Sequence, residues 1–185
     1  VAKFIAVLNS NDPGSAPQDR YGIVTNLSSR LVDLINTKYV LVKADQSVEN
    51  AEQGRYINVF QDKSVVIAEN KDALPRAFMV YEWKISANDT QNLTQLVDPA
   101  FPLSKKVILN EDIPVTQAAE EGMTTPVVEY LSYKEQGSTI SVSTVQEGLL
   151  FVSEIFYPGW KAFIDGQETP VYRANFAFRG VVVPA

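Results

Sequence analysis

The chain has 185 residues and contains neither cysteine nor histidine, which excludes disulfides, thiol nucleophiles and catalysis through a histidine relay. Its 16 basic and 22 acidic residues give a net charge of −6 at pH 7, and no stretch is basic enough to neutralise the phosphates of a nucleic acid. We therefore predict no nucleic-acid partner, and nothing in the composition calls for a metal ion or a cofactor.

The N-terminal half of the chain predicts a mixture of helices and strands. Residues 1–8 are apolar and fit either a strand or a short helix, whereas apolar residues at helical spacing predict a helix over 25–36. A second helix is expected over 86–97, after a capping Asn88 or Asp89. Runs rich in β-branched and aromatic residues predict strands at 38–43, 55–60, 64–69, 76–85 and 105–109.

Residues 110–126 are the best candidate for a boundary, because they contain prolines and acidic residues but few large apolar ones. The sequence that follows is all-β. Asp165-Gly166 is its strongest hairpin signal, since this dipeptide adopts a positive-φ turn at little cost. Strands are expected at 127–134, 139–145, 149–156, 160–164, 168–173 and 180–183.

Together these patterns predict an α+β fold in two parts. A small mixed α/β subdomain over 1–122 is followed by an antiparallel β-sandwich over 123–185, which we expect to be truncated at its C-terminal end. The first part has too little apolar sequence to bury both faces of its strands. We therefore expect the two parts to pack together as one module.

The densest local cluster of aromatic and turn-forming residues lies between Tyr157 and Gly166. One interpretation is a sugar-binding platform, in which Tyr157 and Trp160 stack against the ligand and Asp165 hydrogen-bonds its hydroxyl groups. The other, which the sequence favours, is a turn before a strand. In that case Pro158 and the following glycine bend the chain, and the aromatic rings pack inside the sandwich.

Arg76, Arg173 and Arg179 are candidate anion-binding residues, since a guanidinium group can hold a carboxylate or phosphate through two hydrogen bonds. The simpler interpretation is that they are solvated or paired with acidic side chains. The paired carboxylates at 111–112 and 120–121 lie in loop sequence, without the apolar neighbours that would raise the pKa of one of them. We therefore predict no catalytic residue.

Three stretches carry a resemblance to a known family. Residues 31–41 read LVDLINTKYVL, residues 69–80 read ENKDALPRAFMV, and residues 149–184 read LLFVSEIFYPGWKAFIDGQETPVYRANFAFRGVVVP. Their order and spacing resemble the C-terminal extracytoplasmic part of bacterial YfhO-type membrane proteins. These are large polytopic proteins similar to GT-C glycosyltransferases, which use lipid-linked sugars. The resemblance covers roughly 25–185, and Thr37 stands where that family has valine.

This resemblance implies that the chain is an extracytoplasmic region of a polytopic bacterial protein, located at the cell membrane. It implies two partners: the transmembrane part of its own parent chain, and a glycan or lipid-linked sugar acceptor. The catalytic acidic residue of GT-C enzymes lies in an early extracytoplasmic loop to which nothing in these residues corresponds. No catalytic residue is therefore carried over to this chain.

The expected function is non-catalytic: binding of a glycan or acceptor, a lid, or a docking surface within such a membrane protein. The alternative is a free-standing carbohydrate-binding β-sandwich, which the aromatic residues around 157–160 favour. For either function, the candidate ligand-binding residues are Arg76, Tyr157, Trp160, Asp165 and Arg173.

Overall fold

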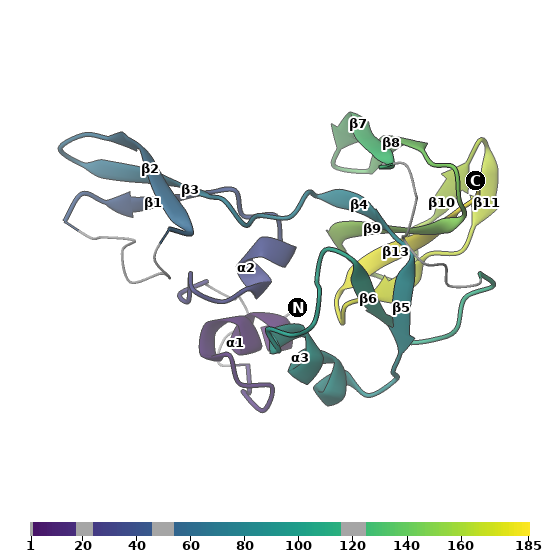
Figure 1. Ribbon diagram of the computed structural model, residues 1–185, viewed down its shortest axis with the longest axis horizontal. Coiled ribbons are helices and arrows are strands. Elements are labelled where there is room, and N and C mark those ends of the chain that lie inside the picture. The colour runs from purple at the N-terminus through teal and green to yellow at the C-terminus, as the bar shows by residue number, and fades with distance from the viewer. Residues whose placement is uncertain (1, 18–23, 46–53, 116–124) are drawn as a thin grey trace. The chain divides into compact units, whose positions relative to one another are not determined.

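The computed structural model describes residues 2–17, 24–45, 54–115 and 125–185 (Figure 1). About 14% of the described residues are helical and 42% are in strands, which form several antiparallel sheets. The predicted α+β class is therefore confirmed. None of the helices within these described ranges has the length and apolar character needed to cross a bilayer.

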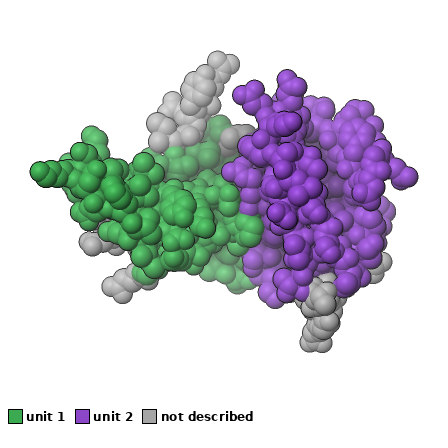
Figure 2. Space-filling view, turned by 90° about the horizontal axis from the view of Figure 1, so that it is seen from above, with its two compact units in different colours: residues 1–75, 93–101 green, residues 76–92, 102–185 purple. Residues whose placement is uncertain are grey.

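The chain divides into two compact units that interleave in sequence (Figure 2). Unit 1 consists of residues 1–75 and 93–101, and unit 2 consists of residues 76–92 and 102–185. The predicted boundary between 122 and 123 lies outside the described residues. Unit 2 takes strands from both sides of that position. The expected packing of the predicted subdomains as one module stays a prediction.

Unit 1 begins with helix α1 (Ala2–Ser10), which resolves the ambiguous apolar start in favour of a helix. The helix predicted over 25–36 is only the short α2 (Leu31–Leu34). Local side-chain bonds explain the difference. Asn26 Oδ1 accepts the Ser28 N–H at 3.1 Å, and Ser29 Oγ accepts the Leu31 N–H at 3.3 Å. Such bonds hold the backbone in turns and compete with the helix.

The sheet of unit 1 has three antiparallel strands in the order β1-β3-β2. They are β1 (Tyr39–Lys43), β2 (Tyr56–Gln61) and β3 (Val65–Asn70), close to the predicted ranges. Alternate residues face opposite sides, so Val40 and Ala68 are buried on one face while Leu41 is exposed on the other.

Helix α3 (Asp89–Val97) starts where the sequence predicts. Asn88 caps it, because its Oδ1 accepts the Gln91 N–H at 3.0 Å. Leu93 and Leu96 on its apolar face are fully buried.

Unit 2 is built on a six-stranded sheet in the order β4-β9-β13-β12-β6-β5. Neighbouring strands are antiparallel except the parallel pair β5–β6. The strands are β4 (Ala77–Val80), β5 (Glu82–Ile85), β6 (Lys106–Leu109), β9 (Gly148–Ile155), β12 (Tyr172–Ala174) and β13 (Phe178–Val183).

The single strand predicted over 76–85 is in fact two strands at opposite edges of this sheet. The chain leaves one strand and enters the other at Tyr81, which is 4% exposed. The Tyr81 hydroxyl lies 2.8 Å from the Thr144 hydroxyl. Local alternation of residues cannot show this break, because the two strands have the same pattern on either side of it.

Two hairpins complete unit 2: β7 (Val127–Lys134) with β8 (Gly137–Ser143), and β10 (Ala162–Ile164) with β11 (Gln167–Thr169). The second confirms the predicted hairpin across Asp165-Gly166, where both residues have positive φ, 50° and 85°. Strand β12 follows as a separate element, whereas the sequence predicts one strand over 168–173.

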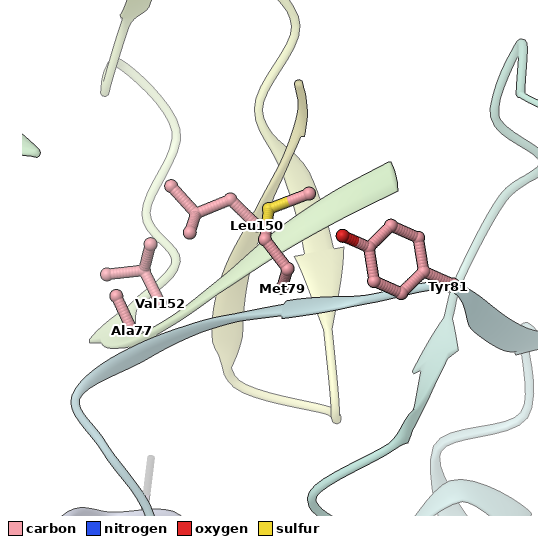
Figure 3. Close-up of a cluster of buried hydrophobic side chains, with 5 residues drawn as sticks. All are labelled: Ala77, Met79, Tyr81, Leu150 and Val152. Atoms are coloured by element: carbon pink, nitrogen blue, oxygen red, sulfur yellow. The ribbon is translucent and has the colours of Figure 1, made fainter. Parts of the chain in front are cut away.

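The β7–β8 hairpin covers one face of the large sheet. The buried cluster beneath it consists of Ala77, Met79, Tyr81, Leu150 and Val152 (Figure 3). Partly buried side chains from the hairpin, including Tyr130 and Ile140, pack against that cluster. A full β-sandwich is not confirmed, because the sheet is mixed and the layer packed here is a two-stranded hairpin.

Candidate functional site

A groove of about 1200 Å³ lies on unit 2. One wall is strand β8 with the turn before it, and the other is the segment 157–165 between β9 and the β10–β11 turn. Residues from β9 and β13, including Glu154 and Arg179, also line it. The groove is therefore built from several successive elements of the chain, all within residues 136–185.

The 157–165 wall presents aromatic rings to solvent. Tyr157 is 69% exposed and Phe163 is 59% exposed, while Trp160 is half-buried between them in sequence. Gly159 has φ of 105°, a value that L side chains rarely adopt, so this glycine permits the turn that separates Tyr157 from Trp160. The Trp160 N–H donates to the Tyr157 carbonyl at 3.3 Å, which closes the turn.

Beside these rings, Arg179 joins a carboxylate to an aromatic ring. Its Nη1 lies 3.0 Å from Glu154 Oε2, and its Nε donates to the Ile155 carbonyl at 2.9 Å. Its guanidinium carbon lies 3.9 Å from the Trp160 ring centroid. The β13 register shifts between Phe178 and Arg179, and such a bulge re-aims the side chains that follow it.

Burial governs the electrostatics of this group. It lowers the pKa of Arg179, and the negative charge of Glu154 opposes that shift. Burial also raises the pKa of the nearby Tyr130 hydroxyl to about 12, and the Glu154 charge adds to that rise. Both effects have one cause: a group removed from bulk water is less stable in its charged form, so its neutral form is favoured.

The β8 wall is made mostly of uncharged polar side chains. The hydroxyls and amide that line it come from Gln136, Ser138, Thr139, Ser143 and Thr144. Such groups can donate and accept hydrogen bonds at once. A ligand that spans the groove would thus contact aromatic rings on one side and hydroxyl groups on the other.

The structure brings three of the predicted site residues together. Tyr157, Trp160 and Asp165 all line the groove. Arg76 and Arg173 are not among its lining residues. Arg179, the third arginine considered as an anion-binding residue, lines the groove beside the aromatic residues, whereas Arg76 and Arg173 lie elsewhere in unit 2.

Both arginines outside the groove contact other side chains. Arg76 has its guanidinium carbon 5.0 Å from the Tyr133 ring centroid, and Nη1 lies 3.4 Å from the Tyr133 hydroxyl. Arg173 pairs with Asp89 at 2.9 Å and donates through Nε to the Phe176 carbonyl. The Arg173–Asp89 pair corresponds to the simpler interpretation given above, pairing with an acidic side chain, whereas the partner of Arg76 is a tyrosine.

Sequence reasoning did not find Glu154, Phe163 and the β8 wall. Glu154 and Arg179 are 25 residues apart, and only the bulged pairing of β9 with β13 brings them together. Phe163 is the middle residue of the three-residue strand β10, and its side chain is more exposed than those of its two neighbours. Among the residues that the structure describes, no three acidic side chains gather closely enough to hold a metal ion.

Comparisons of the chain with protein-family models, with curated proteins and with solved structures gave no match.

Proposed function

We propose that unit 2 binds a glycan in this groove, as a non-catalytic extracytoplasmic domain of a polytopic membrane protein. The observation that carries the glycan proposal is the strong exposure of Tyr157 and Phe163 on a groove whose opposite wall is rich in hydroxyl groups. Aromatic rings offer a flat apolar surface that fits the apolar face of a sugar ring, and hydroxyl groups match its polar edge.

The membrane setting rests on the resemblance alone. The segments 31–41, 69–80 and 149–184 support a YfhO-type parent, the transmembrane part of that parent as a partner, and a glycan or lipid-linked acceptor as the ligand. We further propose that the six-stranded sheet and the β7–β8 hairpin act as the two layers of a sandwich. Partly buried side chains of the hairpin pack against the buried cluster of the sheet, and this contact supports the arrangement.

A free-standing carbohydrate-binding module is the second candidate, and the same exposed rings favour it. The two candidates differ in the parent chain. Segments of ~20 apolar residues elsewhere in the full coding sequence would support the membrane protein, and a coding sequence without them would support the free-standing module.

A glycan array tests the proposal. Wild-type protein should bind a subset of oligosaccharides, and Tyr157→Ala or Phe163→Ala should weaken that binding by about fivefold, because a stacked ring contributes ~1 kcal/mol. The matched control is Tyr39→Ala, which removes an aromatic ring of similar exposure from unit 1. Equal binding by wild type and both groove variants would show that the aromatic wall is not a sugar-binding platform.

A further inference from the structure

We propose that this groove selects uncharged glycan chains, recognising sugar rings and hydroxyl groups and excluding chains whose sugar rings carry carboxylate or sulfate groups. The inference rests on the proposed function, since it names the class of glycan that the same site takes. It follows from how the charged side chains around the groove are paired.

Among the described residues that line the groove, the two basic side chains already have carboxylate partners. Arg179 pairs with Glu154 at 3.0 Å, and each of these side chains is only 15% exposed. Lys161 pairs with Glu168 at 3.0 Å, and these two side chains are more than half exposed. A bound anion would have to displace one of these carboxylates, and would recover no more charge attraction than it removed.

Two further contacts within the protein occupy the guanidinium group of Arg179. Its Nε donates to the Ile155 carbonyl, and its guanidinium carbon lies over the Trp160 ring. The bidentate fork that arginine offers to carboxylates and phosphates is therefore occupied in part by the protein itself. Arg179 serves as a positioning residue for Trp160, whose ring can offer at most one face to a ligand.

A carboxylate outside the Glu154–Arg179 pair opposes an anionic ligand. Asp165 lines the groove at the turn of the β10–β11 hairpin. Like charges brought together at such a site cost binding free energy. Uncharged hydroxyl groups of a sugar can instead form hydrogen bonds with hydroxyl groups of the β8 wall, such as those of Thr139 and Ser143.

One consequence concerns a lipid-linked sugar. The diphosphate of such a molecule carries negative charge, and neither basic side chain of the groove is free to hold it. The groove therefore recognises the glycan chain itself, and a diphosphate group attached to that chain adds nothing to its affinity.

The first test compares ligands on wild-type protein. The probes are neutral oligosaccharides, the same chains with uronate or sulfate groups, and one neutral chain carried on a polyprenyl diphosphate in vesicles. We expect neutral chains to bind, charged chains to bind at least tenfold more weakly, and the diphosphate carrier to leave the affinity unchanged. Tighter binding of charged chains or of the diphosphate form would overturn the inference while leaving glycan binding intact. Binding of no probe would overturn the proposed function, and the inference with it.

The second test releases the paired arginine. Glu154→Gln keeps the shape of the side chain but leaves Arg179 without a charged partner. The ratio of charged-chain to neutral-chain affinity should rise roughly fivefold to tenfold. Glu168→Gln releases Lys161 and should give a smaller rise, because that pair is exposed.

The matched control is Glu82→Gln, which releases Lys106 from a pair at 3.0 Å between β5 and β6, whose residues do not line the groove. Its affinity ratio should equal that of wild type. A thermal unfolding curve establishes whether each variant is folded. If Glu154→Gln does not fold, the affinity ratio of Glu168→Gln serves as the test. An unchanged ratio in a folded Glu154→Gln, or in Glu168→Gln when that variant decides, would overturn the inference.

Discussion

Arg179 lies over the ring of Trp160, with its guanidinium carbon 3.9 Å from the ring centroid. The same guanidinium pairs with Glu154 at 3.0 Å. A cation above an indole ring is attracted to its electron-rich face, and the attraction is larger when water is excluded. One side chain thus fixes the orientation of an aromatic residue in the groove and neutralises a poorly exposed carboxylate.

Replacing Arg179 should lower the free energy of unfolding. Arg179→Met keeps most of the side-chain length but leaves Glu154 without a charged partner. We expect the free energy of unfolding to fall by about 2 kcal/mol, between the values for exposed and for fully buried pairs. Urea unfolding measures the change, and a red shift of the folded-state Trp emission would report the freed Trp160. Lys106→Met is the control, since its pair with Glu82 is more exposed, and its loss should stay below about 1 kcal/mol. Equal losses in the two variants would contradict this prediction.

The raised pKa of Tyr130 predicts that the stability of the protein depends on pH under alkaline conditions. Burial, aided by the charge of Glu154, raises its pKa from 10.0 to about 12 in the folded protein. The folded state therefore holds this proton more tightly than the unfolded state, so its stabilising contribution is complete below about pH 10 and is lost as pH rises toward 12. The stability of wild type relative to Tyr130→Phe should be constant between about pH 8 and 10 and should then fall. A difference that stays flat up to about pH 12, measured by urea unfolding, would show that the hydroxyl titrates normally.

Gly148 opens strand β9 against the ring of Tyr81. A Cβ atom at this position would lie 2.7 Å from two ring carbons of Tyr81 and 3.1 Å from Met79 Cε. Tyr81 is buried and its hydroxyl is held by Thr144, so the ring has little freedom to move away. Gly148→Ala should therefore destabilise unit 2 by about 1–3 kcal/mol in urea unfolding.

The chain offers a matched control at Gly137. This glycine also opens a strand, β8, but a Cβ atom there would meet nothing within 4 Å. Gly137→Ala should change the free energy of unfolding by no more than about 0.5 kcal/mol. If both alanine variants were equally stable, the close approach of Tyr81 to Gly148 would not be a constraint on the fold.

Local sequence signals located most strands but could not assign their neighbours. Alternation and the Asp165-Gly166 turn are properties of a few adjacent residues, and the corresponding strands lie near the predicted ranges. The order of the large sheet is a long-range property. It places β4 and β5, which are adjacent in sequence, at opposite edges, and local alternation does not distinguish that arrangement from one continuous strand.

The candidate site was predictable to a similar extent. Tyr157, Trp160 and Asp165 lie within nine residues of one another, so their clustering is visible in the sequence and they do line one groove. The opposite wall comes from β8, and the charge pairing depends on the bulged register of β9 with β13. Neither feature follows from local spacing, because both require knowledge of which distant strands meet.

In unit 1, Asp33 connects two of the three segments that carry the family resemblance. Its Oδ1 accepts hydrogen bonds from Arg55 Nη2 at 2.6 Å and from Asn70 Nδ2 at 2.8 Å. Arg55 also donates to the carbonyls of Ser28 and Ser29 at 2.9 and 3.0 Å. Burial raises the pKa of Asp33, although the hydrogen bonds and the positive charge of Arg55 oppose the shift. This buried network holds α2 to the sheet.

Removing the Arg55 side chain from this network should destabilise unit 1. Arg55→Met leaves the buried Asp33 carboxylate without its charged partner, and we expect a loss of about 3–5 kcal/mol in the free energy of unfolding at pH 7. The loss should shrink as pH falls through the pKa of Asp33, because a protonated carboxyl carries no charge to compensate. Lys71→Met, which breaks the more exposed pair with Glu69, should lose less than about 1 kcal/mol. Urea unfolding of the variants at pH 7 and near pH 4 measures these values. A loss for Arg55→Met that is small, or that does not depend on pH, would mean that the pair adds little to the stability of unit 1.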